Sequence, residues 1–125
     1  MKSEIPIYLQ LRNQIVMGIG KGEFEEDELL PTVRQMAADL GINNMTVSKA
    51  YQLLKSEGFI ETDRRRGTVI CLPGYEGKDH QEEFQEKLEE ELELLSAEAK
   101  IRGMSYKDFL DYCRQAFSRM EVAAE

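Results

Sequence analysis

The sequence has 125 residues, of which 42% are hydrophobic and 32% are charged. A chain of this length can form one complete hydrophobic core and a short accessory element, and its composition is typical of a soluble globular protein. Its apolar runs are shorter than the roughly 20 residues that span a membrane, and its first residues lack the apolar stretch of a secretory signal. We therefore expect a cytoplasmic protein with no membrane partner.

The net charge of −8 is distributed unevenly along the chain. Residues 1–72 contain nine basic and ten acidic side chains, whereas residues 73–125 contain seven and fourteen. The first segment is thus nearly neutral and includes three consecutive arginines at positions 64–66, while the second is strongly acidic. Because the distribution of charge matters more than its total for nucleic-acid binding, the first segment remains a candidate for such binding.

A first amphipathic helix is expected directly after Pro6, since proline suits the first turn of a helix. Its apolar positions recur at helical spacing. They are Ile7, Tyr8, Leu11, Ile15 and Ile19. Three glycines, at positions 18, 20 and 22, mark its expected end.

Two further helices are expected next, separated by a very short turn. Thr32 and Gln35 form a capping-box pattern at the start of one, and Gly41 stops it because glycine readily adopts the left-handed backbone of helix ends. Asn43 is the expected N-cap of the other, which ends near Gly58. Its inward-facing side chains are Val47, Ala50, Tyr51 and Leu54. Two helices of about three turns joined in this way predict a helix-turn-helix.

A β-hairpin is expected after the third helix. β-branched residues at 59–62 and 68–72 flank a turn at 63–67 that contains the three arginines and a glycine. A hairpin in this position is a wing. Residues 1–72 are therefore expected to form a winged helix-turn-helix DNA-binding domain of three helices and a hairpin.

The remaining residues predict a linker and a helical hairpin. Residues 73–78 are rich in proline and glycine, which favours a linker. Residues 79–125 are expected to form a long acidic helix that ends near Gly103 and a last helix that is capped by Ser105 and Asp108. The last helix is expected to bury Tyr106, Phe109, Leu110, Cys113, Phe117 and Met120. The fold class is thus mainly α, a winged helix-turn-helix followed by a two-helix dimerisation element.

The DNA-binding residues follow from the inward stripe of the third helix, because the first residues of a recognition helix reach base edges in the major groove. Polar side chains there can hydrogen-bond bases or phosphates, and arginines at the wing tip can contact the backbone or enter a minor groove. The expected DNA-binding residues are Arg34, Asn44, Met45, Thr46, Ser48, Lys49, Arg64, Arg65, Arg66, Gly67 and Thr68. Arg34 alone would be an ordinary surface charge and Asn43 is better explained as a cap, but the set as a whole favours DNA binding.

Several motifs together resemble the GntR family of bacterial regulators. They are LPTVRQMA at 30–37, LGIN at 40–43, TVSKAY at 46–51, LKSEGFI at 54–60 and RGTV at 66–69, preceded by PIY at 6–8. The resemblance covers residues 5–72 and implies that Arg34, the helix start at 44–48 and the wing at Arg66 and Gly67 contact DNA. The short helical tail is similar to that of the YtrA subgroup, which implies a dimeric regulator, with repression the expected activity.

Two positions depart from the pattern of this subgroup. Its members usually have Asn-Pro-Asn-Thr where this chain has Asn43, Asn44, Met45 and Thr46. Met45 cannot make the hydrogen bonds of a polar residue, although it can pack against a thymine methyl group. Thr32 replaces the commoner serine and keeps the cap. The resemblance therefore implies operator binding without identifying the operator sequence.

Dimerisation is expected because the tail has more apolar surface than a two-helix hairpin can bury. The residues expected at the dimer interface are Phe84, Leu88, Leu92, Leu95, Phe109 and Phe117. A two-fold homodimer would bind palindromic double-stranded operator DNA. The alternative is that this apolar stripe packs on the N-terminal domain of its own chain.

Other classes of function have less support in the sequence. A winged helix can also be a protein-interaction module without DNA function, which is the main alternative. An enzyme is not expected, because the sequence contains no nucleophile–base pair and no phosphate-binding glycine loop. No cofactor or metal is expected either, since His80 has no ligand-spaced companion and Cys71 and Cys113 are expected to be buried hydrophobes. A small-molecule effector stays open and would bind at the dimer interface or between the domains.

Overall fold

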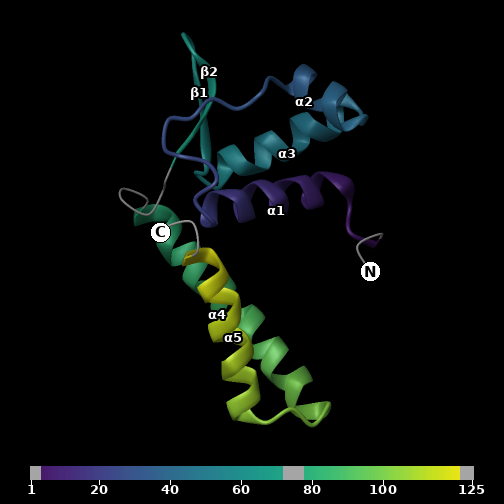
Figure 1. Ribbon diagram of the computed structural model, residues 1–125, viewed down its shortest axis with the longest axis vertical. Coiled ribbons are helices and arrows are strands. Elements are labelled where there is room, and N and C mark those ends of the chain that lie inside the picture. Colours follow the sequence, from purple (N-terminus) through teal and green to yellow (C-terminus); the bar gives the residue numbers. More distant parts are fainter. Residues whose placement is uncertain (1–3, 72–77, 122–125) are drawn as a thin grey trace.

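The computed structural model describes residues 4–71 and 78–121 of the chain. In chain order the elements are α1 (Ile7–Gly20), α2 (Val33–Leu40), α3 (Asn44–Ser56), β1 (Ile60–Asp63), β2 (Gly67–Ile70), α4 (Lys78–Ile101) and α5 (Tyr106–Glu121). The first three helices and the two strands form one body, and the last two helices extend from it as a long hairpin (Figure 1). The expected fold class, a winged helix-turn-helix followed by two helices, is confirmed.

The hydrophobic core lies where α1, α2, α3 and the hairpin meet. Val47 and Leu54 of α3 and Ile70 of β2 are fully buried, and Ile15 of α1 is 4% exposed. The other core residues are Leu30, Ala37, Tyr51 and Ile60. Burial of one such aliphatic side chain contributes about 1.5–3 kcal/mol, so this cluster dominates the stability of the body.

The first helix begins where the sequence predicts and ends at Gly20. The sequence predicts that Gly18 marks the end of this helix, but Gly18 lies inside α1 and is buried. The ring of Phe24 occupies the space beside it: a Cβ atom at Gly18 would lie 2.6 Å from Phe24 Cε2. Gly18 is thus required for packing between α1 and the following loop, rather than for helix termination.

The helix-turn-helix is built from local signals that the sequence identifies correctly. The Thr32 hydroxyl accepts a hydrogen bond from the Gln35 N–H at 3.1 Å, and the Gln35 side chain accepts one from the Thr32 N–H. Gly41 ends α2 in the left-handed conformation, with φ at 68°. Asn43 caps α3, since its Oδ1 accepts a hydrogen bond from the Met45 N–H at 2.6 Å.

The wing is an antiparallel hairpin with Ile60 opposite Ile70 and Asp63 opposite Gly67. The segment around Leu29, which the sequence does not predict as a strand, lies along the free edge of β2, where Leu29 forms an antiparallel bridge with Val69. The Asp27 N–H donates to the Ile70 carbonyl, the Ile70 N–H to the Glu28 carbonyl, and the Leu30 N–H to the Thr68 carbonyl. The loop before α2 therefore holds β2 in place and fixes the position of the wing.

The C-terminal helices differ from the expectation in two ways. Lys78 already belongs to α4, and the rest of the expected linker, residues 73–77, lies outside the described residues. The prediction that the last helix buries its apolar face is wrong for the single chain. Tyr106 is 79% exposed, Phe117 is 72% exposed, and Cys113 is exposed. Phe109 and Met120 of this face are half-buried, and the Met120 sulfur lies against Gly20 of α1. A two-helix hairpin has too little surface to cover the rest of its apolar faces.

None of the helices in residues 4–71 and 78–121 combines the length and the hydropathy of a membrane-spanning segment. The prediction of two buried cysteines is also wrong. Cys71 is half-buried and follows β2 at the edge of the body, and Cys113 lies on the exposed surface of α5. Both are free thiols.

Candidate DNA-binding surface

The orientation of α3 agrees with the sequence analysis. Its inward residues are buried: Val47, Ala50, Tyr51 and Leu54. Asn44, Met45 and Lys49 are exposed, while Thr46 and Ser48 are half-buried. Met45 is 78% exposed, so the helix start presents an apolar thioether to solvent between polar groups. This surface combines hydrogen-bonding groups with one apolar contact.

The backbone donors at the start of α3 are largely occupied. The Asn43 side chain accepts a hydrogen bond from the Met45 N–H. The Thr46 and Val47 N–H groups donate to the Asn43 carbonyl. Among the described residues, the Asn44 N–H is the donor of this first turn that has no protein partner. The start of α3 therefore offers a ligand mainly side-chain groups and few backbone donors.

Lys49 contacts a residue that the sequence analysis assigned only to the apolar stripe of the first helix. The Lys49 Nζ atom lies 4.6 Å from the centroid of the Tyr8 ring, a cation–π contact between α3 and α1. Tyr8 is half-buried, so its ring is held by the body while its face is available to the ammonium group. No local pattern identifies this pair, because it depends on how α1 packs across α3.

The tip of the wing is a turn of three arginines between β1 and β2. Asp63 shapes this turn, since its Oδ1 accepts hydrogen bonds from the backbone N–H groups of Arg65 (2.8 Å) and Arg66 (3.2 Å). These hydrogen bonds lower the pKa of the Asp63 carboxyl group. The side chains of Arg64 and Arg65 are exposed and form no ion pair with the described residues.

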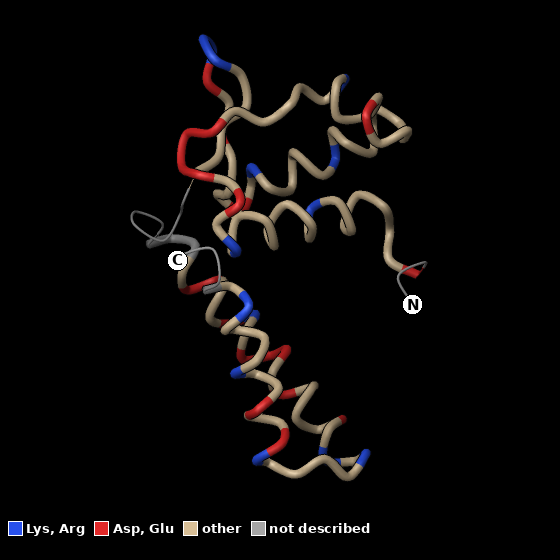
Figure 2. The backbone as a smooth tube through the Cα atoms, viewed as in Figure 1, with Lys and Arg blue, Asp and Glu red and all other residues tan. Residues whose placement is uncertain are grey.

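Arg66 differs from its two neighbours because two carboxylates surround it. Its Nε lies 3.2 Å from Asp63 Oδ2, and its NH2 nitrogen lies 3.7 Å from Asp27 Oδ1. The side-chain hydrogen bond with Asp63 is the largest cause of a raised pKa of the guanidinium. Figure 2 shows the basic residues of the wing tip next to acidic residues of the adjoining chain. Among the residues that the structure describes, the wing thus carries two arginines without an ion pair and one that is paired with carboxylates.

The remaining expected contact residues are Gly67, Thr68 and Arg34. Gly67 follows the turn with φ at 106°, a conformation that favours glycine, and Thr68 is half-buried opposite Thr62. Arg34 is exposed in the first turn of α2, and the described residues offer it no ion pair. In Figure 1 the wing tip lies at the opposite end of the molecule from the turn between α4 and α5.

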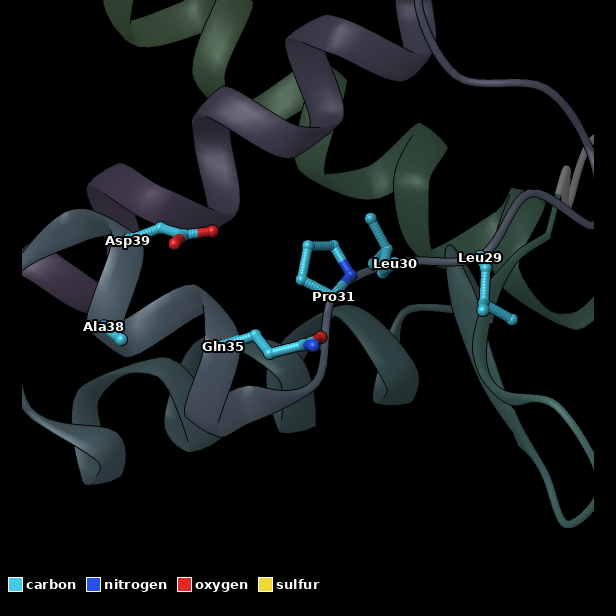
Figure 3. Close-up of a pocket in the computed structure, with 6 residues that line it drawn as sticks. All are labelled: Leu29, Leu30, Pro31, Gln35, Ala38 and Asp39. Carbon is cyan, nitrogen blue, oxygen red and sulfur yellow. The ribbon is translucent and has the colours of Figure 1, made fainter.

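A metal or effector site is not evident in this surface. The described residues contain no group of three or more potential metal ligands. A hollow of about 530 Å³, open to solvent, lies between the loop before α2 and α2 itself (Figure 3). It is lined by Leu29, Leu30, Pro31, Gln35, Ala38 and Asp39. This hollow is within the N-terminal body, away from the positions at which the sequence analysis places an effector.

Comparison with known protein sequences shows the family. The model of the gntR family of bacterial regulatory proteins matches residues 7–70. The transcriptional repressor YtrA of Bacillus subtilis is 45% identical over 69 residues, which are 55% of this chain and 53% of YtrA. The chain thus matches about half the length of that relative. The HTH-type transcriptional regulator YhcF of the same organism is 32% identical over 111 residues, 88% of each chain.

Solved structures extend the similarity to the C-terminal helices. A transcriptional antiterminator from Listeria monocytogenes is 28% identical with a TM-score of 0.77, over 93% of this chain and 85% of that one. The DNA-binding domain of AraR, solved in complex with an operator, is 25% identical with a TM-score of 0.52, over 57% of this chain and 86% of that one. The chain belongs to the gntR family of bacterial regulatory proteins, whose model covers the helix-turn-helix and the wing.

Proposed function

We propose that this regulator acts in the cytoplasm as a homodimeric repressor that binds a palindromic operator. The start of α3 enters the major groove, and the wing contacts the neighbouring backbone or minor groove. The observation that carries the proposal is the combination of an exposed polar start of α3 with an arginine-rich wing tip on one compact body. The named activities of YtrA, a repressor, and of AraR, an operator-binding protein, support it.

The contacts divide into those that position the protein and those that read bases. Lys49, Arg64 and Arg65 carry positive charge that neutralises phosphates independently of sequence. Asn44 and Thr46 can hydrogen-bond base edges in the major groove, and Met45 can pack against a thymine methyl group. The other proposed contacts are Arg34, Ser48, Arg66, Gly67 and Thr68. Specificity in this proposal rests on three residues at the start of α3.

The dimer follows from the exposed apolar side chains of the C-terminal hairpin. Phe84 is 58% exposed, Leu95 is 53% exposed, and Phe117 is 72% exposed. Leu88 and Leu92 are also exposed and Phe109 is half-buried. Such a contiguous apolar surface is unfavourable in water and is typical of an interface. These side chains are exposed or half-buried in the single chain, so the occupant that we propose for this surface is a second copy of the hairpin.

The DNA contacts are tested with operator DNA obtained by selecting tight binders from random duplexes with the full chain. We expect Asn44→Ala and Thr46→Ala to weaken binding to the selected duplex by about 5- to 100-fold and to relax its sequence preference. Arg64→Ala is expected to weaken binding to all duplexes and to reduce the salt dependence by about one unit for each contacted phosphate. If selection yields no preferred sequence and these variants bind as the parent does, the chain is a protein-interaction module instead.

The dimer is tested by light scattering coupled to size-exclusion chromatography. We expect the mass of two chains at micromolar concentration and the mass of one chain for Leu88→Lys, because a lysine at an apolar interface must lose its hydration. Glu90→Lys introduces the same side chain at an exposed acidic position of α4 and is expected to leave the dimer intact. A single-chain mass for the parent protein would contradict the proposed assembly.

A further inference from the structure

Asp27 has an unusual backbone conformation. Its φ is 69°, and it is the one non-glycine residue with positive φ among residues 4–71 and 78–121. An aspartate in this region is tolerated better than most residues but less well than glycine. Hydrogen bonds on both sides maintain the conformation, because the Asp27 N–H donates to the Ile70 carbonyl at 2.8 Å and the Ile70 N–H donates to the Glu28 carbonyl at 2.9 Å. A residue held in such a conformation is a candidate for a functional role.

The side chain of Asp27 lies beside the wing, where it contacts Arg66. Asp27 Oδ1 is 3.7 Å from the NH2 nitrogen of Arg66, and the two side chains are 66% and 48% exposed. Asp63 pairs with the same guanidinium but also accepts two backbone hydrogen bonds of the turn. The position of Asp63 is therefore explained by its hydrogen bonds to the backbone of the turn. Within residues 4–71 and 78–121, Arg66 is the basic side chain with which the Asp27 carboxylate forms an ion pair.

We propose that Asp27 is a DNA-affinity-determining residue that acts as an intramolecular counter-charge for Arg66. In the free protein its carboxylate partly neutralises the guanidinium, and a DNA phosphate must replace that carboxylate when the wing binds. The exchange makes the Arg66 contact weaker than that of an unpaired arginine, since the released carboxylate is left near the phosphate and attracts a cation from solution. This inference rests on the proposed contact between the wing and DNA.

Asp27→Asn isolates the charge, because asparagine has nearly the same size and also tolerates positive φ. An exposed ion pair of this kind is a weak interaction. We therefore expect the variant to bind DNA about two- to fivefold more tightly for each wing that contacts DNA. We also expect a steeper dependence of affinity on salt, by up to about one unit for each wing, because no carboxylate takes up a cation on binding.

The experiment measures the affinity of the full chain for a mixed-sequence duplex of about 30 base pairs between about 50 and 200 mM salt. Four variants are compared with the parent: Asp27→Asn, Arg66→Ala, the double variant and Glu26→Gln. Glu26→Gln removes the same charge from the adjacent position and is the matched control. Circular dichroism establishes that each variant is folded.

The proposal expects tighter binding for Asp27→Asn, a clearly smaller gain for Glu26→Gln, and no gain from Asp27→Asn in the Arg66→Ala background. An equal gain in the Arg66→Ala background overturns it, because the effect is then general electrostatics. Unchanged or weaker binding of Asp27→Asn, with weaker binding of Arg66→Ala, overturns the counter-charge but not the wing contact. Unchanged binding of Arg66→Ala overturns both.

Discussion

The Lys49 ammonium lies 4.6 Å above the ring of Tyr8, so the recognition helix and the first helix share a contact at the proposed DNA surface. A cation–π contact at an exposed site contributes about 0.5–1 kcal/mol. It also restricts a lysine side chain that would otherwise be mobile. Lys49 is therefore held in a limited range of positions before DNA arrives.

Replacement of Tyr8 should weaken DNA binding through Lys49. For Tyr8→Leu we expect a loss of affinity of about two- to fivefold for each recognition helix, since the lysine must then be ordered on binding. Tyr8→Phe keeps the ring and should bind like the parent. Filter binding or fluorescence anisotropy with the selected duplex measures the difference. Equal affinities for Tyr8→Leu and Tyr8→Phe would show that the ring does not position Lys49.

Tyr51 connects α3 to the segment that precedes α2. Its hydroxyl donates to the Pro31 carbonyl at 2.8 Å, and the residue is 6% exposed. Tyr51→Phe leaves this carbonyl without its partner, so we expect a loss of about 1 kcal/mol in the free energy of unfolding at pH 8. Urea denaturation measures this value. A loss below about 0.3 kcal/mol would mean that water replaces the hydroxyl.

The same residue predicts a dependence of stability on alkaline pH. Burial raises the pKa of Tyr51 from 10.0 to about 12 in the folded chain. Between these values the folded chain binds more protons than the unfolded chain, so stability is fully present below pH 10 and falls as the pH rises toward 12. At pH 11 the free energy of unfolding of the parent should have fallen by about 1.4 kcal/mol through Tyr51, a decrease that Tyr51→Phe lacks. The difference in the free energy of unfolding between the two proteins should therefore fall to about zero or change sign at pH 11. A difference that does not change with pH would contradict the raised pKa of Tyr51.

Arg12 and Glu57 form a bidentate ion pair that joins α1 to the C-terminal end of α3. The Arg12 Nε and NH2 atoms lie 2.9 and 3.0 Å from the two Glu57 oxygens, and the arginine side chain is 14% exposed. We expect Arg12→Lys to lower the free energy of unfolding by about 1 kcal/mol, because lysine cannot match both oxygens. Arg114→Lys alters an exposed pair with Asp111 and should change it by less than about 0.5 kcal/mol. Equal effects of the two substitutions would argue against the bidentate geometry.

The Thr32 cap should contribute to the stability of α2 independently of any ligand. Thr32→Ala removes one half of the capping box with Gln35, and we expect a cost of about 1 kcal/mol in thermal or urea unfolding. Thr32→Ser retains the hydroxyl and should be within about 0.5 kcal/mol of the parent. A similar destabilisation by both substitutions would indicate that the methyl group of Thr32, and not its hydroxyl, is the important feature.

The sequence correctly predicts features whose interactions lie within a few residues. The capping box at Thr32, the left-handed Gly41 and the cap at Asn43 each depend on residues two to four positions away, so their chemistry can be read locally. The buried stripe of α3 is also predicted, because the helical period alone determines which side chains share a face. These signals account for the helix-turn-helix and for the place of the hairpin in the order of the elements.

The sequence does not predict the environments of the proposed contact residues. It treats Arg64, Arg65 and Arg66 alike, whereas the structure pairs Arg66 with Asp27 from a distant loop. It assigns Gly18 to a helix end, but the ring of Phe24 explains that glycine. In both cases the decisive neighbour is brought close by the packing of a loop, for which there is no periodic signal.

What the sequence by itself determined is the order of the elements, the inward face of α3 and the membership of its motifs in a regulator family. The tertiary structure decided which charges on the proposed DNA-binding surface form ion pairs, that Lys49 contacts the Tyr8 ring, and that apolar side chains of α4 and α5 remain exposed in one chain. The physical reason is the range of the interactions. Helix periodicity and caps act between near neighbours, whereas ion pairs and burial depend on residues that meet only after the chain has folded, such as Arg12 and Glu57, 45 positions apart.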